Sequence, residues 1–300
     1  MSDEPIMADV AAPSIHPSTF VSHTACVEPG ARLGMRVTIE RGAEIGDGAQ
    51  VGDGVHIGAD VRVGTDVRIG PHAVILGTDD APPGAARTEL RHGVRVGASA
   101  TLVAGLLVEA NAVVRPGSVV TRSVPAGAIV EGNPATITGY VDMTTGSHGP
   151  VVAMVPDGRT GTEQTAVKGV TVHHFPIIPD LRGNLTVGEF ERQIPFVPLR
   201  YFMVFGVPSR EIRGEHAHLQ CHQFLICIRG SCAVVADDGQ RRVEVVLDSP
   251  NRGLYLPPMT WGVQYKYTPD AMLLVFASHH YDANDYVRDH SAFLKLVQAP

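Results

Sequence analysis

An aliphatic residue recurs at every sixth position between residues 21 and 75, and this period restricts the possible fold more than any other feature of the sequence. The recurring residues are Val21, Val27, Leu33, Ile39, Ile45, Val51, Ile57, Val63, Ile69 and Ile75. A period of six fits neither a helix of 3.6 residues per turn nor an alternating strand. It predicts a parallel β-helix, in which three hexads form one coil of roughly 18 residues and stacked coils bury a continuous core.

This ladder of aliphatic residues is interrupted once. It resumes with Val96, Leu102, Val108, Val114 and Val120. The step from Ile75 to Val96 is 21 residues, which is not a multiple of six, so part of the chain must leave the coil. Residues 77–93 contain prolines, glycines, acidic residues and a histidine, and we expect them to form an exposed functional loop.

The pattern changes in the second half of the chain. From Val170 onward, short alternating strands are separated by Gly, Pro and Asp-Gly turns, with a hairpin expected at Asp238-Gly239 and a short helix within 285–296. This arrangement is typical of a jelly-roll or cupin barrel. Residues 142–168 are rich in Gly, Thr and Pro and predict a linker. We therefore expect a mainly β protein with a β-helix domain at 1–141, a linker at 142–168 and a barrel domain at 169–300.

Composition excludes several classes of protein. The net charge of −7 argues against nucleic acid as the main partner. The first ten residues lack the apolar region of a signal peptide, and no apolar run approaches the length of a membrane span. The cysteines show no framework spacing, which indicates reduced thiols in a cytoplasmic protein. They are Cys26, Cys221, Cys227 and Cys232.

The sequence Gly-Glu-His-Ala-His places His216 and His218 two residues apart on a predicted strand, so both side chains point to the same face. In a barrel this face is the interior. A metal-binding cupin would continue with a Glu four or five residues later, where this chain has His222 and Gln223, and with a further His, which the region 257–261 does not offer. We therefore expect no metal cofactor. Two imidazoles without a metal suit proton transfer near neutral pH. Buried histidines satisfied by their neighbours are the alternative.

The segments RGEHAH, DSPNRGLYLPPMTWG and VFASHHYDANDYVRD resemble the sugar-nucleotide 3,4-ketoisomerases, over roughly residues 170–296. The resemblance implies conversion of dTDP-4-keto-6-deoxyglucose into a 3-keto-6-deoxyhexose, with His216 and His218 as base and acid. It leaves open which histidine does which, and whether the product has the galacto or the gluco configuration at C4. The substrate-binding candidates are three arginines, whose guanidinium groups suit a diphosphate, and one tyrosine. They are Arg182, Arg200, Arg213 and Tyr201.

The six-residue repeat resembles the hexapeptide-repeat acyltransferases, whose coils wind left-handed and bind acetyl-CoA between the subunits of a trimer. Ser-Val-Pro at 123–125 and Gly-Asn-Pro-Ala at 132–135 resemble the closing signature of these enzymes. The resemblance implies cofactor contacts at Ala98, Ser99, Asn133 and Pro134.

Acyl transfer requires a neutral amine, so we expect a basic residue or an orienting carboxylate near the interruption of the ladder. The candidates for this catalytic role are Glu89, His92 and Asp80. Asp79 and His72 are further candidates for binding the sugar substrate.

Together the two halves resemble the bifunctional WxcM-like ketoisomerase/N-acetyltransferases. The hypothesis is that the barrel isomerises the keto sugar, a separate pyridoxal-phosphate aminotransferase installs a 3-amino group, and the β-helix acetylates that group for surface polysaccharide such as O antigen. A hexamer would accommodate both a β-helix that trimerises and a barrel that dimerises. The alternative is a β-helix that only trimerises the chain and carries one active or sugar-binding barrel.

Overall fold

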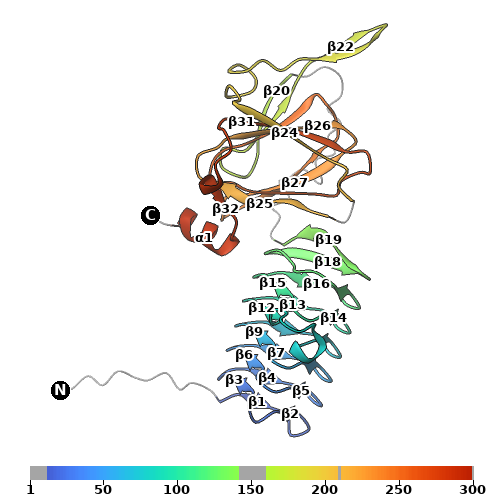
Figure 1. Cartoon of the computed structure of the whole chain (residues 1–300), viewed down its shortest axis with the longest axis vertical. Helices are drawn as coiled ribbons and strands as arrows, with labels where there is room; N and C mark the ends of the chain where they lie inside the picture. The colour runs from blue at the N-terminus through green and yellow to red at the C-terminus, as the bar shows by residue number, and fades with distance from the viewer. Residues whose placement is uncertain (1–11, 142–159, 209–210, 299–300) are drawn as a thin grey trace, which may run out of the picture. The chain divides into compact units, whose positions relative to one another are not determined.

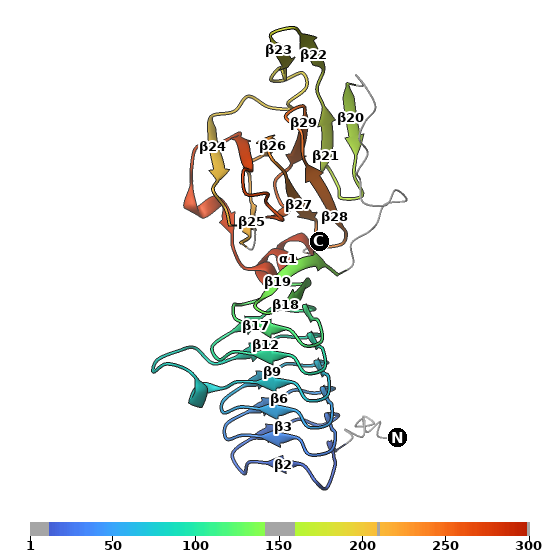
Figure 2. The ribbon, with the colours of Figure 1, turned by 90° about the vertical axis from the view of Figure 1, so that its right-hand side faces the viewer.

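The computed structural model describes residues 12–141, 160–208 and 211–298, and the chain divides into two compact units, Met1–Val141 and Asp142–Pro300. The first unit is a stack of short parallel strands that ends in one antiparallel hairpin (Figures 1 and 2). Its strands are β1 (Ser14–Ile15), β2 (Phe20–Val21), β3 (Cys26–Val27), β4 (Arg32–Leu33), β5 (Thr38–Ile39), β6 (Glu44–Ile45), β7 (Gln50–Val51), β8 (His56–Ile57), β9 (Arg62–Val63), β10 (Arg68–Ile69), β11 (Val74–Ile75), β12 (Glu89–Leu90), β13 (Arg95–Val96), β14 (Thr101–Leu102), β15 (Leu107–Val108), β16 (Val113–Val114), β17 (Val119–Val120), β18 (Ala128–Gly132) and β19 (Ala135–Tyr140).

Each coil of this unit contributes one strand to each of three sheets. Ile39 pairs with Ile57, for example, eighteen residues later, so each coil places its aliphatic residues above those of the coil before it. From β4 to β17 the second residue of every strand is buried and the first is more exposed. The predicted β-helix is therefore confirmed, and its core consists of the ladder residues and the small residues that follow them.

The interruption of the ladder is shorter than predicted. Leu90 is fully buried and pairs with Val63 below and Val108 above, so the chain has returned to the coil by β12. The residues that project from the stack lie between β11 and β12, including the short helix η1 (Thr78–Asp80) (Figure 2). The expected loop at 77–93 was too long because Leu90, six residues before Val96, is itself a rung of the ladder.

The second unit consists mainly of antiparallel strands in two larger sheets and one hairpin. The strands are β20 (Gly161–Gln164), β21 (Thr171–His174), β22 (Ile177–Asp180), β23 (Gly183–Thr186), β24 (Arg200–Phe205), β25 (Arg213–His218), β26 (Gln223–Arg229), β27 (Cys232–Asp237), β28 (Arg242–Leu247), β29 (Arg252–Leu256), β30 (Trp261–Tyr265), β31 (Met272–Ala277) and β32 (Tyr286–Val287). One sheet has the order β20-β21-β29-β26-β31-β24, and the other has the order β28-β27-β30-β25-β32. This is the cupin-like architecture that the alternating strands predicted.

The core of the second unit lies between these two sheets. It includes Leu225 and Leu273 from the first sheet and Val234 and Leu247 from the second, all fully buried. The predicted hairpin at Asp238-Gly239 is confirmed, because β27 and β28 pair on either side of it.

The beginning and end of the second unit differ from the sequence-based boundaries. Strand β20 pairs with β21 and Val167 is buried in the core, so the residues from 161 onward, expected as linker, belong to the barrel. The rest of that segment, 142–159, lies outside the described residues. The terminal helix α1 (His290–Gln298) begins later than residue 285, because η2 (Ala283–Asp285) and β32 come first. None of the helices in the described ranges is long and apolar enough to cross a membrane.

Candidate active site

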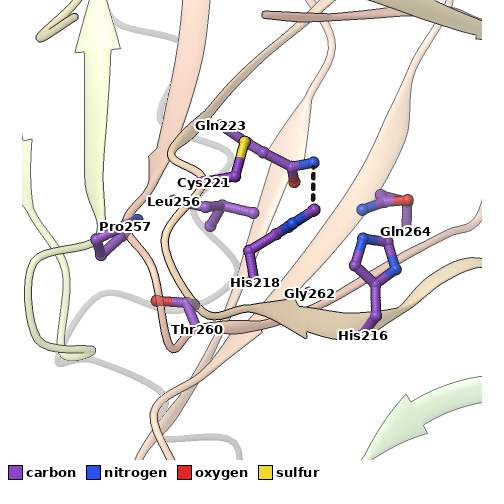
Figure 3. Close-up of a pocket in the computed structure, with 9 residues that line it drawn as sticks. All are labelled: His216, His218, Cys221, Gln223, Leu256, Pro257, Thr260, Gly262 and Gln264. Atoms are coloured by element: carbon purple, nitrogen blue, oxygen red, sulfur yellow. Dashed lines mark hydrogen bonds between the residues drawn. The ribbon is translucent and has the colours of Figure 1, made fainter. Parts of the chain in front are cut away.

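The histidine pair lies on β25 directly after a bulge. Gly214 and Glu215 have φ angles of 86° and 53°, and the pairing with β30 shifts between Gly214 and His216. Glycine is needed here, because a Cβ at position 214 would lie 2.5 Å from the carbonyl oxygen of Gly262. After the bulge, His216 and His218 project from the same face of the strand (Figure 3), with ring centroids 4.9 Å apart. The prediction that the two imidazoles share a face is confirmed.

Hydrogen bonds determine which nitrogen of each ring carries the proton. His216 Nδ1 lies 2.8 Å from the carbonyl oxygen of Gly214, and His218 Nδ1 lies 2.8 Å from Asp285 Oδ2. Carbonyl and carboxylate oxygens only accept hydrogen bonds, so both Nδ1 atoms donate and both Nε2 atoms carry a lone pair. The Gln223 amide nitrogen lies 3.1 Å from His218 Nε2 and can donate to it.

Asp285 is fixed from the backbone side as well. Its carboxylate accepts hydrogen bonds from the backbone N–H groups of Gln220, at 2.7 Å, and Cys221, at 3.3 Å. Burial alone would raise the pKa of Asp285, but the hydrogen bonds from His218 and from these two N–H groups outweigh it and lower the pKa. Asp285 is therefore a carboxylate that orients His218.

Both histidines are neutral at neutral pH. Burial lowers the pKa of His216 to about 4, against a weaker opposing effect of the hydrogen bond to Gly214. Burial also lowers the pKa of His218, but the hydrogen bond to Asp285 and its negative charge act in the opposite direction. A neutral imidazole can accept a proton at the lone pair of its Nε2, which is what a general base requires.

Aromatic and cationic side chains surround the pair. The ring of Tyr286 lies 4.9 Å from that of His216 and 4.4 Å from that of His218, and the Arg288 guanidinium lies 4.4 Å from the Tyr286 centroid. The Arg200 guanidinium lies 5.6 Å from the ring of Tyr281, and its buried Nε has no hydrogen-bond partner within the described ranges. These groups add positive charge and a phenol next to the histidines.

Three of these residues were not singled out from the sequence. They are Asp285, Tyr286 and Arg288, and all lie in the segment VFASHHYDANDYVRD, which the sequence connects to the 3,4-ketoisomerases by resemblance alone. Asp285 is 67 residues from its histidine partner, so no local spacing connects the two.

A small cavity borders the histidines on the side of the barrel interior. Its volume is about 10 Å³, enough for about one water molecule. It is lined by His216, His218, Cys221, Gln223, Leu256, Pro257, Thr260, Gly262 and Gln264 (Figure 3). A sugar is far larger, so it must reach the pair from another side, and His216 is the more exposed of the two histidines.

Of the predicted substrate-binding residues in this unit, only Arg200 acts electrostatically on the pair. Arg213 begins the same strand but is exposed. Tyr201 is 68% exposed, since the alternation of β24 directs Phe202 rather than Tyr201 toward the core. Arg182 lies at the turn of the β22–β23 hairpin, where its side chain is 90% exposed and ion-paired with Asp180.

The predicted residues of the first unit lie at different corners of the coil. Asp80 accepts a hydrogen bond from the Gly77 backbone in η1, where Asp79 is ion-paired with Arg41. His92, at the corner after β12, lies 2.9 Å from Thr65 Oγ1 and 3.8 Å from Asp66.

The remaining candidates are also dispersed. His72 and the turn of Ala98 and Ser99 occupy the corner that follows β10 and β13, and Glu89 lies half-buried on β12. Asn133 and Pro134 form the turn between β18 and β19. The structure therefore does not gather these candidates into one site within a single chain.

The arginines on two faces of the β-helix differ in whether they form ion pairs. On the β12 face, Arg62 and Arg87 pair with Glu44, at 3.5 and 3.1 Å, and Arg91 pairs with Glu109 at 2.8 Å. On another of the three faces, strands β4, β7, β10 and β13 stack a row of polar residues, the arginine row. It consists of Arg32, Gln50, Arg68 and Arg95.

The arginines of this row have no ion pair within the part of the chain that the structure describes. They line a groove of about 610 Å³, together with Arg115, one carboxylate, Asp53, and glycines at the coil corners. A groove of this size with unneutralised guanidinium groups can accommodate an anionic ligand.

Each unit is similar to a known protein family. Residues 168–298 match the family model described as WxcM-like, C-terminal, and residues 42–77 match that of the bacterial transferase hexapeptide, six repeats. A TDP-4-oxo-6-deoxy-alpha-D-glucose-3,4-oxoisomerase from Aneurinibacillus thermoaerophilus is 40% identical over 126 residues, which cover 42% of this chain and 91% of that protein.

Two further proteins show the extent of the similarity. A dTDP-3-amino-3,6-dideoxy-alpha-D-galactopyranose 3-N-acetyltransferase from the same organism is 45% identical over 60 residues, 20% of this chain and only 31% of that protein. The crystal structure of a sugar 3,4-ketoisomerase from Thermoanaerobacterium thermosaccharolyticum in complex with TDP has 32% identity and a TM-score of 0.43, and the match covers 44% of this chain and 96% of that one.

Proposed function

Because the chain belongs to the WxcM-like family of sugar-nucleotide 3,4-ketoisomerases, we propose that its second unit converts dTDP-4-keto-6-deoxyglucose into the 3-keto-6-deoxyhexose. The observation that carries this proposal is the pair of neutral histidines, one of them held by a partly buried carboxylate. The reaction needs such groups, since the hydrogen on C3 is acidic beside the C4 ketone and must be removed by a base. The product differs from the substrate only in the position of hydrogen atoms.

In this proposal His218 is the base that acts on carbon. Its Nε2 gives up the hydrogen bond from Gln223 and takes the proton from C3, the electron pair of the C–H bond forms the enolate, and Asp285 stabilises the imidazolium that results. The same imidazolium then returns a proton to C4. His218 suits this step better than His216, because the carboxylate opposes the loss of basicity that burial causes.

His216 moves the proton between the two oxygens. Its free Nε2 accepts the proton of the C3 hydroxyl and delivers it to the oxygen on C4, so that the ketone moves from C4 to C3 without a proton from outside. Arg200 and Arg288 supply positive charge for the developing enolate or for the diphosphate. Which group they contact depends on the orientation of the sugar.

Isotope exchange tests this function directly. The protein is incubated with dTDP-4-keto-6-deoxyglucose in deuterated water, and the sugar is analysed by NMR. We expect deuterium at the carbons that exchange protons and accumulation of the 3-keto isomer. Absence of both would rule out the proposed reaction.

For the first unit, we propose acetyl transfer from acetyl-CoA to the 3-amino group of a dTDP-3-amino-3,6-dideoxyhexose. Support comes from the hexapeptide coil and from the arginine row, since both the donor and the acceptor carry a diphosphate. The scattered candidate residues would meet only if neighbouring chains contribute them, which agrees with a trimer or a hexamer. A separate aminotransferase would have to supply the amino sugar between the two reactions.

Thiol release from acetyl-CoA in the presence of the amino sugar tests this second activity. The Arg68→Gln, Arg95→Gln variant should raise KM for one of the two substrates about tenfold, whereas Arg62→Gln on the paired face should change it less than twofold. The dispersal of the candidate residues favours one alternative, a β-helix that serves only as an oligomeric scaffold. That alternative predicts no thiol release with any amino sugar.

A further inference from the structure

One group next to the histidine pair has no part in the proposed reaction. The Cys221 side chain is buried, and its thiol has only weak partners, the His222 carbonyl at 3.4 Å and Ser278 Oγ at 3.9 Å. Its sulfur, a ring nitrogen of His218 and a carboxylate oxygen of Asp285 all lie within 4.8 Å of one another. The position of each of these three side chains, taken alone, is explained without a metal ion.

We propose that His218, Cys221 and Asp285 form a zinc site whose occupation blocks the isomerase. The three ligand atoms are a nitrogen, a sulfur and an oxygen, the set from which zinc sites are built. Around a tetrahedral zinc ion such atoms are roughly 3.3–3.7 Å apart, given bond lengths of about 2.0–2.3 Å. The 2.8 Å between His218 Nδ1 and Asp285 Oδ2 must widen by about 0.5 Å, and the separations from the Cys221 sulfur, at most 4.8 Å, must close by at most about 1.5 Å to reach tetrahedral spacing. The fourth position stays open to water.

The charges and atom types of the three ligands also favour zinc over other cations. A thiolate and a carboxylate together neutralise a divalent cation, so the loaded site would bury no net charge. Magnesium and calcium prefer oxygen ligands and would gain little from a thiolate and an imidazole. Arg200 and Arg288, whose positive charges lower the pKa of His218, weaken the binding of any cation and keep the affinity moderate.

Zinc binding changes the position of two protons. The Cys221 thiol loses its proton to solvent as the zinc–sulfur bond forms, and the proton of His218 moves from Nδ1 to Nε2 as Nδ1 binds the metal. Gln223 faces Nε2 at 3.1 Å and can accept from it through the amide oxygen after the amide turns. His218 then has no free lone pair and no carboxylate partner, so it cannot act as a base.

Cobalt provides a test of the site that does not depend on activity. The intact protein is titrated with Co²⁺ alone, and absorption is followed. We expect a thiolate-to-cobalt band that saturates at one ion per chain, is lost in Cys221→Ser and in Cys221→Ala, and persists in Cys26→Ser, which removes an exposed cysteine of the first unit. No band in the wild-type protein, or an unchanged band in both Cys221 variants that are folded by circular dichroism, overturns the proposal.

A second arm tests inhibition and rests on the proposed isomerase function. The rate of deuterium exchange into the keto sugar is compared with and without Zn²⁺ within each variant. We expect at least a tenfold decrease in the wild-type protein, restored by a chelator, and less than twofold in Cys221→Ser. A cobalt band without inhibition would confirm the site and refute its inhibitory role. A protein that isomerises no keto sugar would refute the proposed function and leave the cobalt result to decide the site.

Discussion

The two units of this protein differ in what they bury. In the described part of the β-helix, the buried polar side chains are Thr88 and Ser118, and the rest of the core is aliphatic except for Tyr140. The barrel buries histidine, glutamine, aspartate and arginine side chains, including His218, Gln223 and Asp237. In a narrow coil the strands bond to the coils above and below, and the interior has space for one aliphatic layer. Two facing sheets enclose more space, so a polar network can be built between them.

This difference predicts where chemistry can occur. The barrel can hold a desolvated acid–base group within one chain, whereas the β-helix must build a site on its surface or between chains. Each of the following experiments tests one side of that comparison.

The largest effect is expected from the double variant His216→Asn, His218→Asn. Removing both proton carriers should lower isomerisation at least 1,000-fold, in the range known for general acid–base catalysis. Acetyl transfer should remain within twofold of wild type, because the proposed acetyltransferase site lies in the β-helix. Loss of both activities in a folded protein would refute two independent sites.

A cavity in the β-helix core should affect stability rather than chemistry. Ile57 is fully buried, and Ile57→Ala should destabilise the first unit by about 3 kcal/mol. Val74→Ala, on the partly exposed position of the neighbouring strand, should cost about 1 kcal/mol or less. Urea unfolding measures both, and isomerase activity should survive the first transition. A single shared transition would show that the units unfold together.

The Asp285→Asn variant tests whether Asp285 positions His218 for the reaction or only stabilises the fold. We expect kcat for isomerisation to fall about 10- to 100-fold, as for partners that orient a catalytic group. The carboxylate raises the pKa of His218, so the variant should also move the acid limb of kcat/KM to lower pH. A merely structural role would leave that limb in place. Asp270→Asn, at an exposed aspartate, serves as the control.

Acid should destabilise the barrel through His216. Its folded-state pKa of about 4 lies below the unfolded value of about 6.5, so the unfolded chain binds the proton first and stability falls as the pH drops from 6.5 toward 4. Between pH 7 and pH 4.5 this histidine should account for about 2 kcal/mol. Urea titrations of wild type and His216→Asn at both pH values measure the difference. His23→Asn, exposed in the first unit, should not change it.

The sequence was most informative where structure repeats locally. The six-residue ladder predicted the coil, its buried residues and the place where the chain leaves it, because every rung occupies an equivalent environment. Even Leu90 was visible as a rung by counting back from Val96. The histidine pair was equally accessible, since two positions on one strand share a face.

Other parts of the site could not be read from spacing. Tyr201 lies on a strand as expected, but its outward direction follows from which face of β24 meets the core. The charge of each arginine is evident from sequence. Only the stacking of coils shows that Arg62 is ion-paired with a carboxylate and that Arg32, Arg68 and Arg95 have no ion pair within the described ranges.

The sequence by itself therefore determined the β-helix, the two-part organisation and the pair of histidines. Only the tertiary structure supplied Asp285, which reaches His218 from 67 residues away, and Cys221 beside them. The physical reason is the range of the interactions involved. The repeating pattern of a strand or coil is set by residues close together in sequence. The pKa of a buried imidazole depends instead on the side chains that the fold brings next to it.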